Sequence, residues 1–346
     1  RSTKEESCKV EKQGKVWLVG AGPSDAGLMT LKGKAVLEQA DVVVYDALVS
    51  ASVLAMIPEQ AQTVYVGKRS GHHSVPQPQI NQILLEQAQQ GKRVVRLKGG
   101  DPFLFGRGGE ELELLREHNI PFEVVPGITS AIAVPAYNGI PVTHRDYCSS
   151  VHIITAHSKQ DGELNIPFPA LCQLHGTLVF LMGVTSMERI CRGLLQAGMD
   201  AQTPAAILQE GTSAAQRRVV ATLSTLVERA QQEKIQAPAV LVIGKVCQLA
   251  DQLSWTQLRP LDKVRVILTR PKELVSRMAD RLYQLGAQVI ELPSISLQPY
   301  EENEPLKTAL EHLESYRWVA FTSIAGVRIF FEQLQKYRVD LRKLMH

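Results

Sequence analysis

Short apolar runs alternate with stretches of helical periodicity along the first part of the chain. The stretch QINQILLEQAQQG places Ile80, Ile83 and Leu84 on one face of a helix. The apolar runs that predict strands are KVWLVG, DVVVYD, TVYVG, KRVVRLKGG and PFEVVPG. Continuous apolar strands separated by helices predict a parallel sheet covered by helices on both faces.

The pattern changes at VPAYNGIPVTHRDY, whose prolines and glycine are typical of a linker. Beyond it, strands follow one another more closely and predict a mixed sheet that ends near Trp255. A third unit then begins, with strands expected at KVRVILTRP, AQVIELP and RWVAFTS. The predicted fold class is α/β, with two α/β domains and a partial third α/β unit. The predicted divisions are a disordered tail 1–14, an N-terminal domain 15–134, a linker 135–147, a second domain 148–255 and a third segment 262–346.

The composition excludes several classes of protein. With 346 residues, 45% hydrophobic and 21% charged, the chain is expected to be soluble and to form two or three domains. A net charge of +3 gives no reason to expect nucleic acid as a partner. The five cysteines have no metal-ligand spacing and are expected to be reduced, which favours a cytoplasmic protein without a metal. No apolar run approaches the roughly 18 residues of a membrane span, and no signal peptide is recognisable.

The loop VGAGPSDAG begins like a dinucleotide fingerprint but does not complete it. The third glycine position holds Asp25, a carboxylate where a pyrophosphate would need a helix N-terminus, and only spacing makes Asp46 resemble a ribose ligand. A dinucleotide, a turn without a ligand and a different ligand all stay open, and the residues favour the last.

A second glycine cluster lies in RLKGGDPFLFGRGGEE. Ordering five glycines costs chain entropy, which is understandable where backbone must approach a ligand closely. Asp101 offers hydrogen-bond acceptors there, and the absence of G-K-[ST] argues against a nucleoside triphosphate. The alternative is a tight surface loop before a helix that begins near Glu110 and Glu111.

These motifs, in order, resemble the uroporphyrinogen-III C-methyltransferases of the tetrapyrrole methylase family. The resemblance rests on VGAGPSDAGLMTLKG, ADVVVYDALVS, VYVGKRSG, RLKGGDPFLFGRGGEE, VVPGITSA, GIPVTHRDY, TLVFLMGV, EGTSAAQR and APAVLVIGKV. It implies a homodimer and an S-adenosyl-L-methionine site in a trough between two α/β domains. It also implies methylation of uroporphyrinogen III at carbons 2 and 7, which gives precorrin-2 for sirohaem or cobalamin and releases S-adenosyl-L-homocysteine.

The resemblance also assigns the residues of the site. The implied donor-binding residues are Pro23, Gly99, Gly100, Asp101, Leu104, Thr129, Ser130, Met182, Gly211 and Ala239. Asp46 becomes the general base and Lys68 its acid partner, although a turn cap and a solvated amine are the plain alternatives for these two. Because the substrate carries eight carboxylates, nearby basic residues are expected to bind it. The basic residues near the motif loops are Lys68, Arg69, Arg96, Lys98, Arg107, His144 and Arg145, and those assigned to substrate binding are Arg69, Arg107, His144 and Arg145.

Two departures from the family pattern alter these expectations. Ser24 stands where the family has glycine, so strain is expected if its φ is positive. From about Asp262 the chain resembles the beginning of uroporphyrinogen-III synthase, with Ala325 where asparagine is usual, and stops short of that family's length. We therefore expect no synthase activity, and no dehydrogenase unit before Gly14. The remaining alternatives are another tetrapyrrole methylase or a catalytically silent tetrapyrrole-binding scaffold for a fused synthase.

Overall fold

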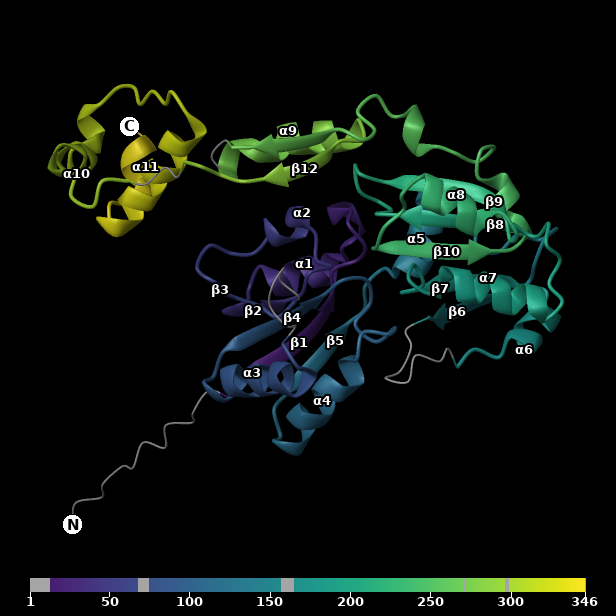
Figure 1. The fold of residues 1–346 in the computed structure, drawn as a ribbon. Coiled ribbons are helices and arrows are strands. Elements are labelled where there is room, and N and C mark those ends of the chain that lie inside the picture. Colours follow the sequence, from purple (N-terminus) through teal and green to yellow (C-terminus); the bar gives the residue numbers. More distant parts are fainter. Residues whose placement is uncertain (1–12, 68–74, 157–164, 270–271, 296–298, 346) are drawn as a thin grey trace, which may run out of the picture. The chain divides into compact units, whose positions relative to one another are not determined.

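The structure is a computed structural model that describes residues 13–67, 75–156, 165–269, 272–295 and 299–345 (Figure 1). Most of the tail predicted at 1–14 lies outside these ranges. The chain divides into two compact units, one of residues 1–266 and 282–290, the other of residues 267–281 and 291–346. In the described part of the chain, no helix is both long and apolar enough to cross a membrane.

The first sheet contains five parallel strands in the order β3-β2-β4-β1-β5. Their bounds are β1 Lys15–Gly20, β2 Val42–Tyr45, β3 Gln62–Tyr65, β4 Arg93–Lys98 and β5 Phe122–Val125. Since β4 and β5 flank β1, the loops that follow these three strands emerge side by side at the carboxyl edge of the sheet. This edge is where open parallel sheets hold ligands.

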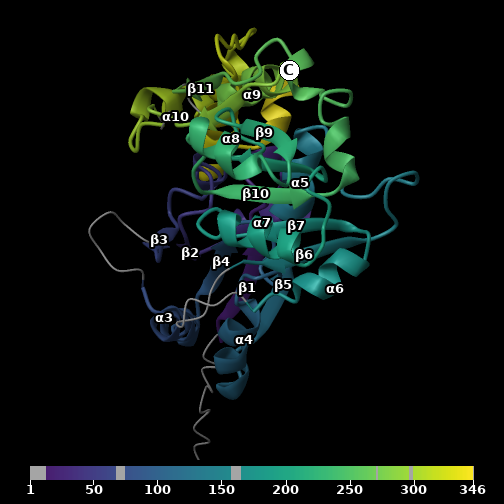
Figure 2. The same ribbon diagram turned by 45° about the vertical axis from the view of Figure 1, so that its right-hand side comes forward.

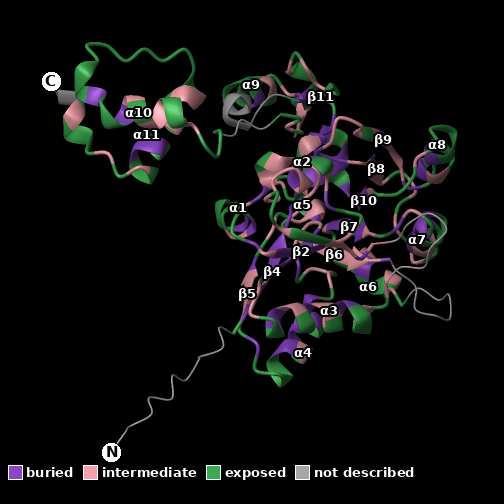
Figure 3. Cartoon of the chain, turned by 90° about the vertical axis from the view of Figure 1, so that its left-hand side faces the viewer, coloured by how far each residue is buried: buried purple, intermediate pink, exposed green. Residues whose placement is uncertain are grey.

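Helices cover both faces of this sheet, as the continuous apolar strands predicted. On one face, α3 (Gln77–Gln89) and α4 (Gly108–Glu117) pack Leu84 and Leu115 against Leu18. On the other, α1 (Leu31–Leu37) and α2 (Ala51–Leu54) pack Leu37 and Val53 against Val43. Figure 3 shows the contrast between the buried strands and the exposed outer faces of α3 and α4.

The second sheet is mixed, as predicted, in the order β6-β7-β10-β8-β9 (Figure 2). Only β6 and β7 are parallel, and the other pairs are antiparallel. The strands are β6 Val151–Thr155, β7 Thr177–Leu181, β8 Pro204–Gln209, β9 Arg217–Thr222 and β10 Ala239–Ile243. One face is covered by α6 Phe168–Gln173, α7 Met187–Gln196 and α8 Leu226–Gln232.

The opposite face of the second sheet is covered by α5 (Ser130–Tyr137), which follows the last strand of the first sheet. Ala131 and Val134 of this helix share a buried cluster with Val179, Leu208 and Val242. The first turn of α5 therefore stands at the carboxyl edge of the first sheet, while its apolar side belongs to the core of the second.

The remaining elements begin with 3-10 helices at Lys245–Leu249 and Thr256–Leu258, followed by β11 (Arg265–Leu268) and β12 (Gln288–Glu291), which form a two-stranded sheet. The helices are α9 Lys272–Gln284, α10 Glu304–Glu311 and α11 Ile324–Lys336, with 3-10 turns at Leu313–Ser315 and Leu341–Met345. In the second unit, Leu310, Leu313 and Leu334 form a small core.

The strand predicted at 317–323 does not form. Trp318 is 84% exposed in this stretch, and the structure assigns it no strand partner. An extended segment needs a neighbouring strand for its backbone hydrogen bonds, so β-rich composition alone did not produce one here.

Candidate active site

The two glycine-rich loops are joined to each other by backbone hydrogen bonds. Gly22, after β1, donates to the carbonyl of Gly100 at 3.2 Å, and Gly100, after β4, donates to the carbonyl of Gly22 at 2.7 Å. Both residues have a left-handed φ, +71° and +70°, where a side chain is unfavourable. The glycines at these positions therefore allow two loops at the carboxyl edge to form one surface.

The loop after β5 packs closely against this surface. A Cβ on Gly127 would lie 2.2 Å from the carbonyl oxygen of Gly100, so only glycine fits. Asp101 fixes the same junction, because its Oδ2 accepts from the Gly127 N–H at 3.0 Å. Its Oδ1 accepts from the N–H groups of Phe103 and Leu104 at 2.8 and 3.1 Å. Asp101 thus organises the loop that the sequence assigned to ligand binding.

Space is left in front of the first turn of α5. A Cβ on Gly100 would find no atom closer than the backbone nitrogen of Ser130, at 4.0 Å. Thr129 caps this helix by accepting from the Ala131 N–H at 3.2 Å. A helix N-terminus with free N–H groups favours a negatively charged group. The glycine surface and this helix therefore suit a ligand that has a carboxylate and needs close backbone contact.

The predicted contributors from the second sheet gather at one edge of that sheet. Met182 follows β7, Gly211 follows β8, and Ala239 begins β10, which is antiparallel to both strands. Met182 has a φ of +56° and is 49% exposed, unlike a core methionine. Gly211 is pressed against α5, since a Cβ there would lie 2.3 Å from Cγ1 of Val134.

Asp46 stands at the carboxyl end of β2, and its two oxygens have different partners. Oδ1 accepts from the N–H of Leu48 at 3.1 Å, the turn-capping bond that was its plain alternative role. Oδ2 accepts from Nη2 of Arg96 at 3.2 Å, and the side chain is 25% exposed. The carboxylate is thus oriented by the protein and still reached by solvent.

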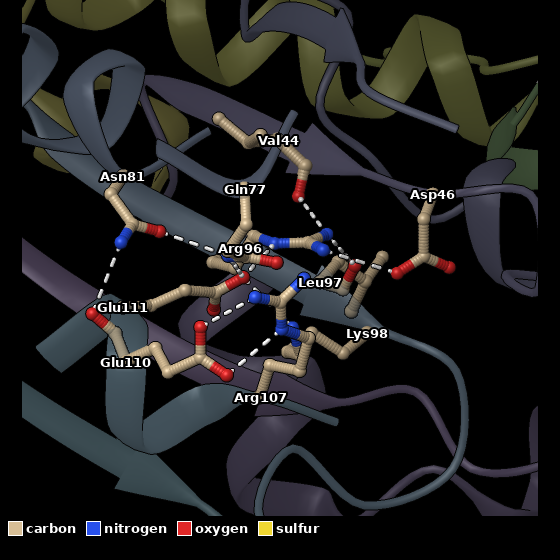
Figure 4. Close-up of polar contacts among 10 residues, drawn as sticks. All are labelled: Val44, Asp46, Gln77, Asn81, Arg96, Leu97, Lys98, Arg107, Glu110 and Glu111. Carbon is tan, nitrogen blue, oxygen red and sulfur yellow. Dashed lines mark hydrogen bonds and ion pairs between the residues drawn. The ribbon is translucent and has the colours of Figure 1, made fainter. Parts of the chain in front are cut away.

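Behind Asp46 lies a buried cluster of charges that we call the Glu111 cluster, consisting of Arg96, Lys98 and Glu111 (Figure 4). Oε1 of Glu111 accepts from Nε of Arg96 at 3.2 Å and from Nζ of Lys98 at 2.9 Å. Nη1 of Arg96 also donates to the carbonyl of Leu97 at 3.0 Å. The guanidinium is therefore held from several sides while one N–H reaches Asp46.

Burial shifts the pKa of one member of this cluster. Desolvation, with the repulsion of Arg96, lowers the pKa of Lys98, and the attraction of Glu111 only partly offsets it. Glu111 is fully buried, and its Oε2 accepts no hydrogen bond from the described residues. Two cations therefore share one carboxylate oxygen in a site with little water.

The predicted substrate-binding cations are placed less uniformly. Arg107 is half-exposed and forms a bidentate pair with Glu110 at 2.9 and 2.6 Å, which raises the pKa of Arg107 and lowers that of Glu110. His144 packs on Tyr147 and accepts from the N–H of Asp146, and Arg145 is exposed in the same turn. Lys68 and Arg69 lie outside the described residues.

Ser24 lacks the strained conformation considered for it, because it is not among the residues of positive φ. The strain lies elsewhere, at Met182, Glu210 and Thr212, whose φ values are +56°, +45° and +68°. Sequence reasoning did not identify Thr212 or Glu111 as parts of the site, and it expected Arg96 and Lys98 among the basic residues facing the substrate carboxylates, whereas both are buried against Glu111. A signal for the cluster was present: Arg96 and Lys98 lie two residues apart in an apolar strand, so their side chains share one face.

Comparison with known proteins identifies the family to which the chain belongs. The family described as Tetrapyrrole (Corrin/Porphyrin) Methylases matches residues 15–227, and the family described as Uroporphyrinogen-III synthase HemD matches residues 276–346. The chain belongs to the tetrapyrrole methylases. The expected methyltransferase class, the two α/β domains and the partial synthase-like third unit are therefore confirmed.

Particular relatives narrow the comparison. Porphyrin biosynthesis protein HemD of Ruminiclostridium josui is 51% identical over 331 residues, which cover 96% of this chain and 66% of the relative. Siroheme synthase 2 of Yersinia enterocolitica is 54% identical over 243 residues, 70% of this chain and 51% of the relative. The chain thus spans between half and two thirds of the length of these relatives.

A solved structure covers the methylase part. Uroporphyrin-III C-methyl transferase from Thermus thermophilus, complexed with S-adenyl homocysteine, is 38% identical, with a TM-score of 0.59. The match covers 68% of this chain and 100% of that one. In that relative, the bound molecule is what a methyl donor of the predicted kind leaves after transfer.

Proposed function

We propose that this chain transfers methyl groups from S-adenosyl-L-methionine to carbons 2 and 7 of uroporphyrinogen III. The products are precorrin-1 and then precorrin-2, for sirohaem or cobalamin synthesis. The observation that carries the proposal is the position of Asp46: an oriented, partly exposed carboxylate at the same sheet edge as the joined glycine loops.

The donor fits the residues at this edge. Its carboxylate suits the first turn of α5 at Thr129 and Ser130, where the Ser130 backbone nitrogen lies beside the space left at Gly100. Its ribose and adenine suit the glycine backbone at Gly99 and Gly100. We assign the remaining predicted contacts to Pro23, Asp101, Leu104, Met182, Gly211 and Ala239.

When bound, the donor supplies an electrophilic methyl group on a sulfonium sulfur. The protein's part is to orient the two reactants, exclude water and place charge. A pyrrole carbon forms the new bond as the carbon–sulfur bond breaks, and a proton must afterwards leave the macrocycle. We assign the uptake of that proton to the Asp46 carboxylate, which is partly exposed to solvent. We propose Lys68 as the acid partner.

Arg96 has a supporting part in this scheme. Its N–H on Oδ2 orients the Asp46 carboxylate, and its other N–H groups are fixed by Glu111 and backbone carbonyls. Because Arg96 and Lys98 are buried, the substrate carboxylates are left to other basic residues. We propose Arg69, Arg107, His144 and Arg145 for that task.

The test is incubation of the chain with S-adenosyl-L-methionine and uroporphyrinogen III without oxygen, with mass spectrometry and absorbance of the products. We expect a product carrying two added methyl groups and an equivalent amount of S-adenosyl-L-homocysteine. Another corrinoid methylase would leave uroporphyrinogen III unchanged and methylate a later intermediate. A silent scaffold for a fused synthase would bind tetrapyrrole and methylate none.

We further propose that the chain acts as a homodimer in the cytoplasm. The family resemblance supports the dimer. The cytoplasmic location is supported by Cys148, Cys172, Cys191 and Cys247, which are free thiols in the described part of the chain. Sedimentation of the purified chain tests the dimer directly.

A further inference from the structure

The loop that carries Pro23 is held by a residue of the second sheet. The N–H groups of Ser24 and Asp25 both donate to Oγ1 of Thr212, at 3.0 and 3.1 Å. A hydroxyl oxygen has two lone pairs for acceptance, and here each receives one N–H. These bonds join residues 187 or more positions apart. They connect the loop after β1 with the turn after β8, and both segments carry predicted donor-binding residues.

Thr212 is itself fixed by a closed ring of hydrogen bonds. Its N–H donates to Oε1 of Gln216 at 2.8 Å, and Nε2 of Gln216 donates to the carbonyl of Tyr137 at 3.3 Å. The Tyr137 hydroxyl then donates to Oδ2 of Asp25 at 2.7 Å, which returns to the loop. The ring thus connects the first loop, α5 and the turn after β8.

Other contacts rigidify the two ends of the ring. Trp255 packs edge-on against Tyr137 with 5.0 Å between ring centroids and donates from Nε1 to the carbonyl of Ala136 at 2.9 Å. At the opposite end, Oδ1 of Asp25 accepts from the Gly27 N–H at 2.8 Å and from the Tyr283 hydroxyl. Burial and the bond to Asp25 raise the pKa of Tyr137, so its hydroxyl keeps the proton that it donates.

The backbone of Thr212 is unfavourable for its residue type. It has a φ of +68°, in the left-handed region that β-branched residues rarely occupy, and it is 8% exposed. Glycine would relieve the strain. The chain instead has a residue that supplies an oxygen to two N–H groups, which indicates that the oxygen is what the position requires.

We propose that Thr212 is a positioning residue for the methyl donor. By holding Ser24 and Asp25, it keeps Pro23 and the Gly22–Gly100 bridge in the arrangement that the donor meets. The inference rests on the donor site of the proposed function. A loop that is already ordered does not have to be ordered during binding, so the effect appears in donor affinity.

The test compares Thr212→Val with Thr212→Ser by calorimetric binding of S-adenosyl-L-homocysteine. Valine keeps the shape and removes the acceptor, while serine keeps the hydroxyl. We expect valine to raise Kd about tenfold or more and serine to stay within about threefold of the parent chain. Thr212→Val should raise KM for S-adenosyl-L-methionine in parallel and leave kcat within about threefold, a separation that general loss of structure does not produce.

If the Thr212→Val variant does not fold, the Thr212→Gly variant provides the test. It relieves the backbone strain, so a purely structural role predicts parent-like or tighter binding, whereas the proposal predicts the same loss as valine. Binding within about twofold of the parent chain in either folded variant overturns the inference. Because binding of S-adenosyl-L-homocysteine needs no turnover, a parent chain that binds it but methylates nothing refutes the proposed reaction while leaving this test intact.

Discussion

Nη2 of Arg96 lies 3.2 Å from Oδ2 of Asp46, and this contact links a solvent-reached carboxylate to a fully buried one. On its other side the same guanidinium binds Glu111, so the arginine is shared between two acids. Such an arrangement fixes the direction of the Asp46 carboxylate without covering it. The contact leads to different predictions for substitutions of Asp46 and of Glu111.

For the exposed acid, we expect loss of turnover without loss of donor binding. Asp46→Asn keeps the size of the side chain and the bond from Leu48 but cannot take up the proton. Turnover should fall by about 10²–10⁴-fold, the usual contribution of a general base. Initial rates of methyl transfer and calorimetric binding of S-adenosyl-L-homocysteine measure the two quantities. Full activity in Asp46→Asn would remove this residue from the chemistry.

For the buried acid, we expect a loss of stability. Glu111→Gln leaves Arg96 and Lys98 close together without their shared carboxylate, which should lower the free energy of unfolding by about 3–5 kcal/mol. The control is the neighbouring Glu110→Gln, which breaks only a half-exposed pair with Arg107 and should change it by about 0.5 kcal/mol or less. Chemical denaturation measures both, and equal losses would contradict the cluster's role.

The junction of glycine loops gives a steric prediction. Gly127→Ala places a methyl group against the backbone of Gly100 and Gly20, which neither can avoid without moving. We expect about 1–3 kcal/mol of destabilisation and at least about tenfold weaker donor binding. Gly109→Ala is the matched control, because a Cβ there meets nothing within 4 Å and alanine favours a helix by about 0.5–1 kcal/mol. If Gly127→Ala left the Kd for S-adenosyl-L-homocysteine unchanged, the junction of the glycine loops would not be part of the donor site.

The buried thiols lead to predictions for their chemical labelling and for the pH dependence of stability. Desolvation raises the pKa of Cys191 to about 11 and that of Cys247 to about 12. Both should resist iodoacetamide at pH 8 in the folded protein and react once it is unfolded, whereas the partly exposed Cys148 reacts earlier. Mass spectrometry of labelled peptides follows each site.

The sign of the linked stability follows from the same shifts. A thiol whose pKa is higher in the folded state binds its proton more tightly there. Its contribution to stability is therefore complete below the unfolded pKa of about 8.5 and is lost as the pH rises through 11 to 12. Rapid native labelling of Cys247 at pH 8 would contradict the burial on which this rests.

The sequence predicted those features of the fold that depend on local pattern. Apolar runs and helical spacing identified the parallel sheet, and the glycines after β1 and β4 indicated loops that approach a ligand. The strand order that places β1 between β4 and β5 did not follow, because it depends on how distant helices dock. Residues 317–323 show the same limit, because their β-rich composition predicted a strand that the structure does not contain.

The candidate site could be predicted from residue type at the glycine-rich loops, whereas the role of Asp46 followed from the family resemblance and stays a prediction. The site was not predictable where a partner lies far along the chain. Arg96 and Lys98 were expected near the substrate carboxylates, but Glu111, from α4, lies beside them and they are buried with it. The sequence likewise gives Thr212 no role, because its partners Ser24 and Asp25 lie in the first loop and donate to it only in the folded chain.

The helix α5 has a practical consequence for recombining this protein with its relatives. Its first turn stands at the glycine surface while Ala131 and Val134 lie in the core of the second sheet. A chimera joined within the proline-rich stretch 134–147 would inherit this helix from one parent and the sheet beneath it from the other. A crossover at Pro126 or Gly127 would instead carry the helix with its sheet, so that both parents contribute intact packing layers.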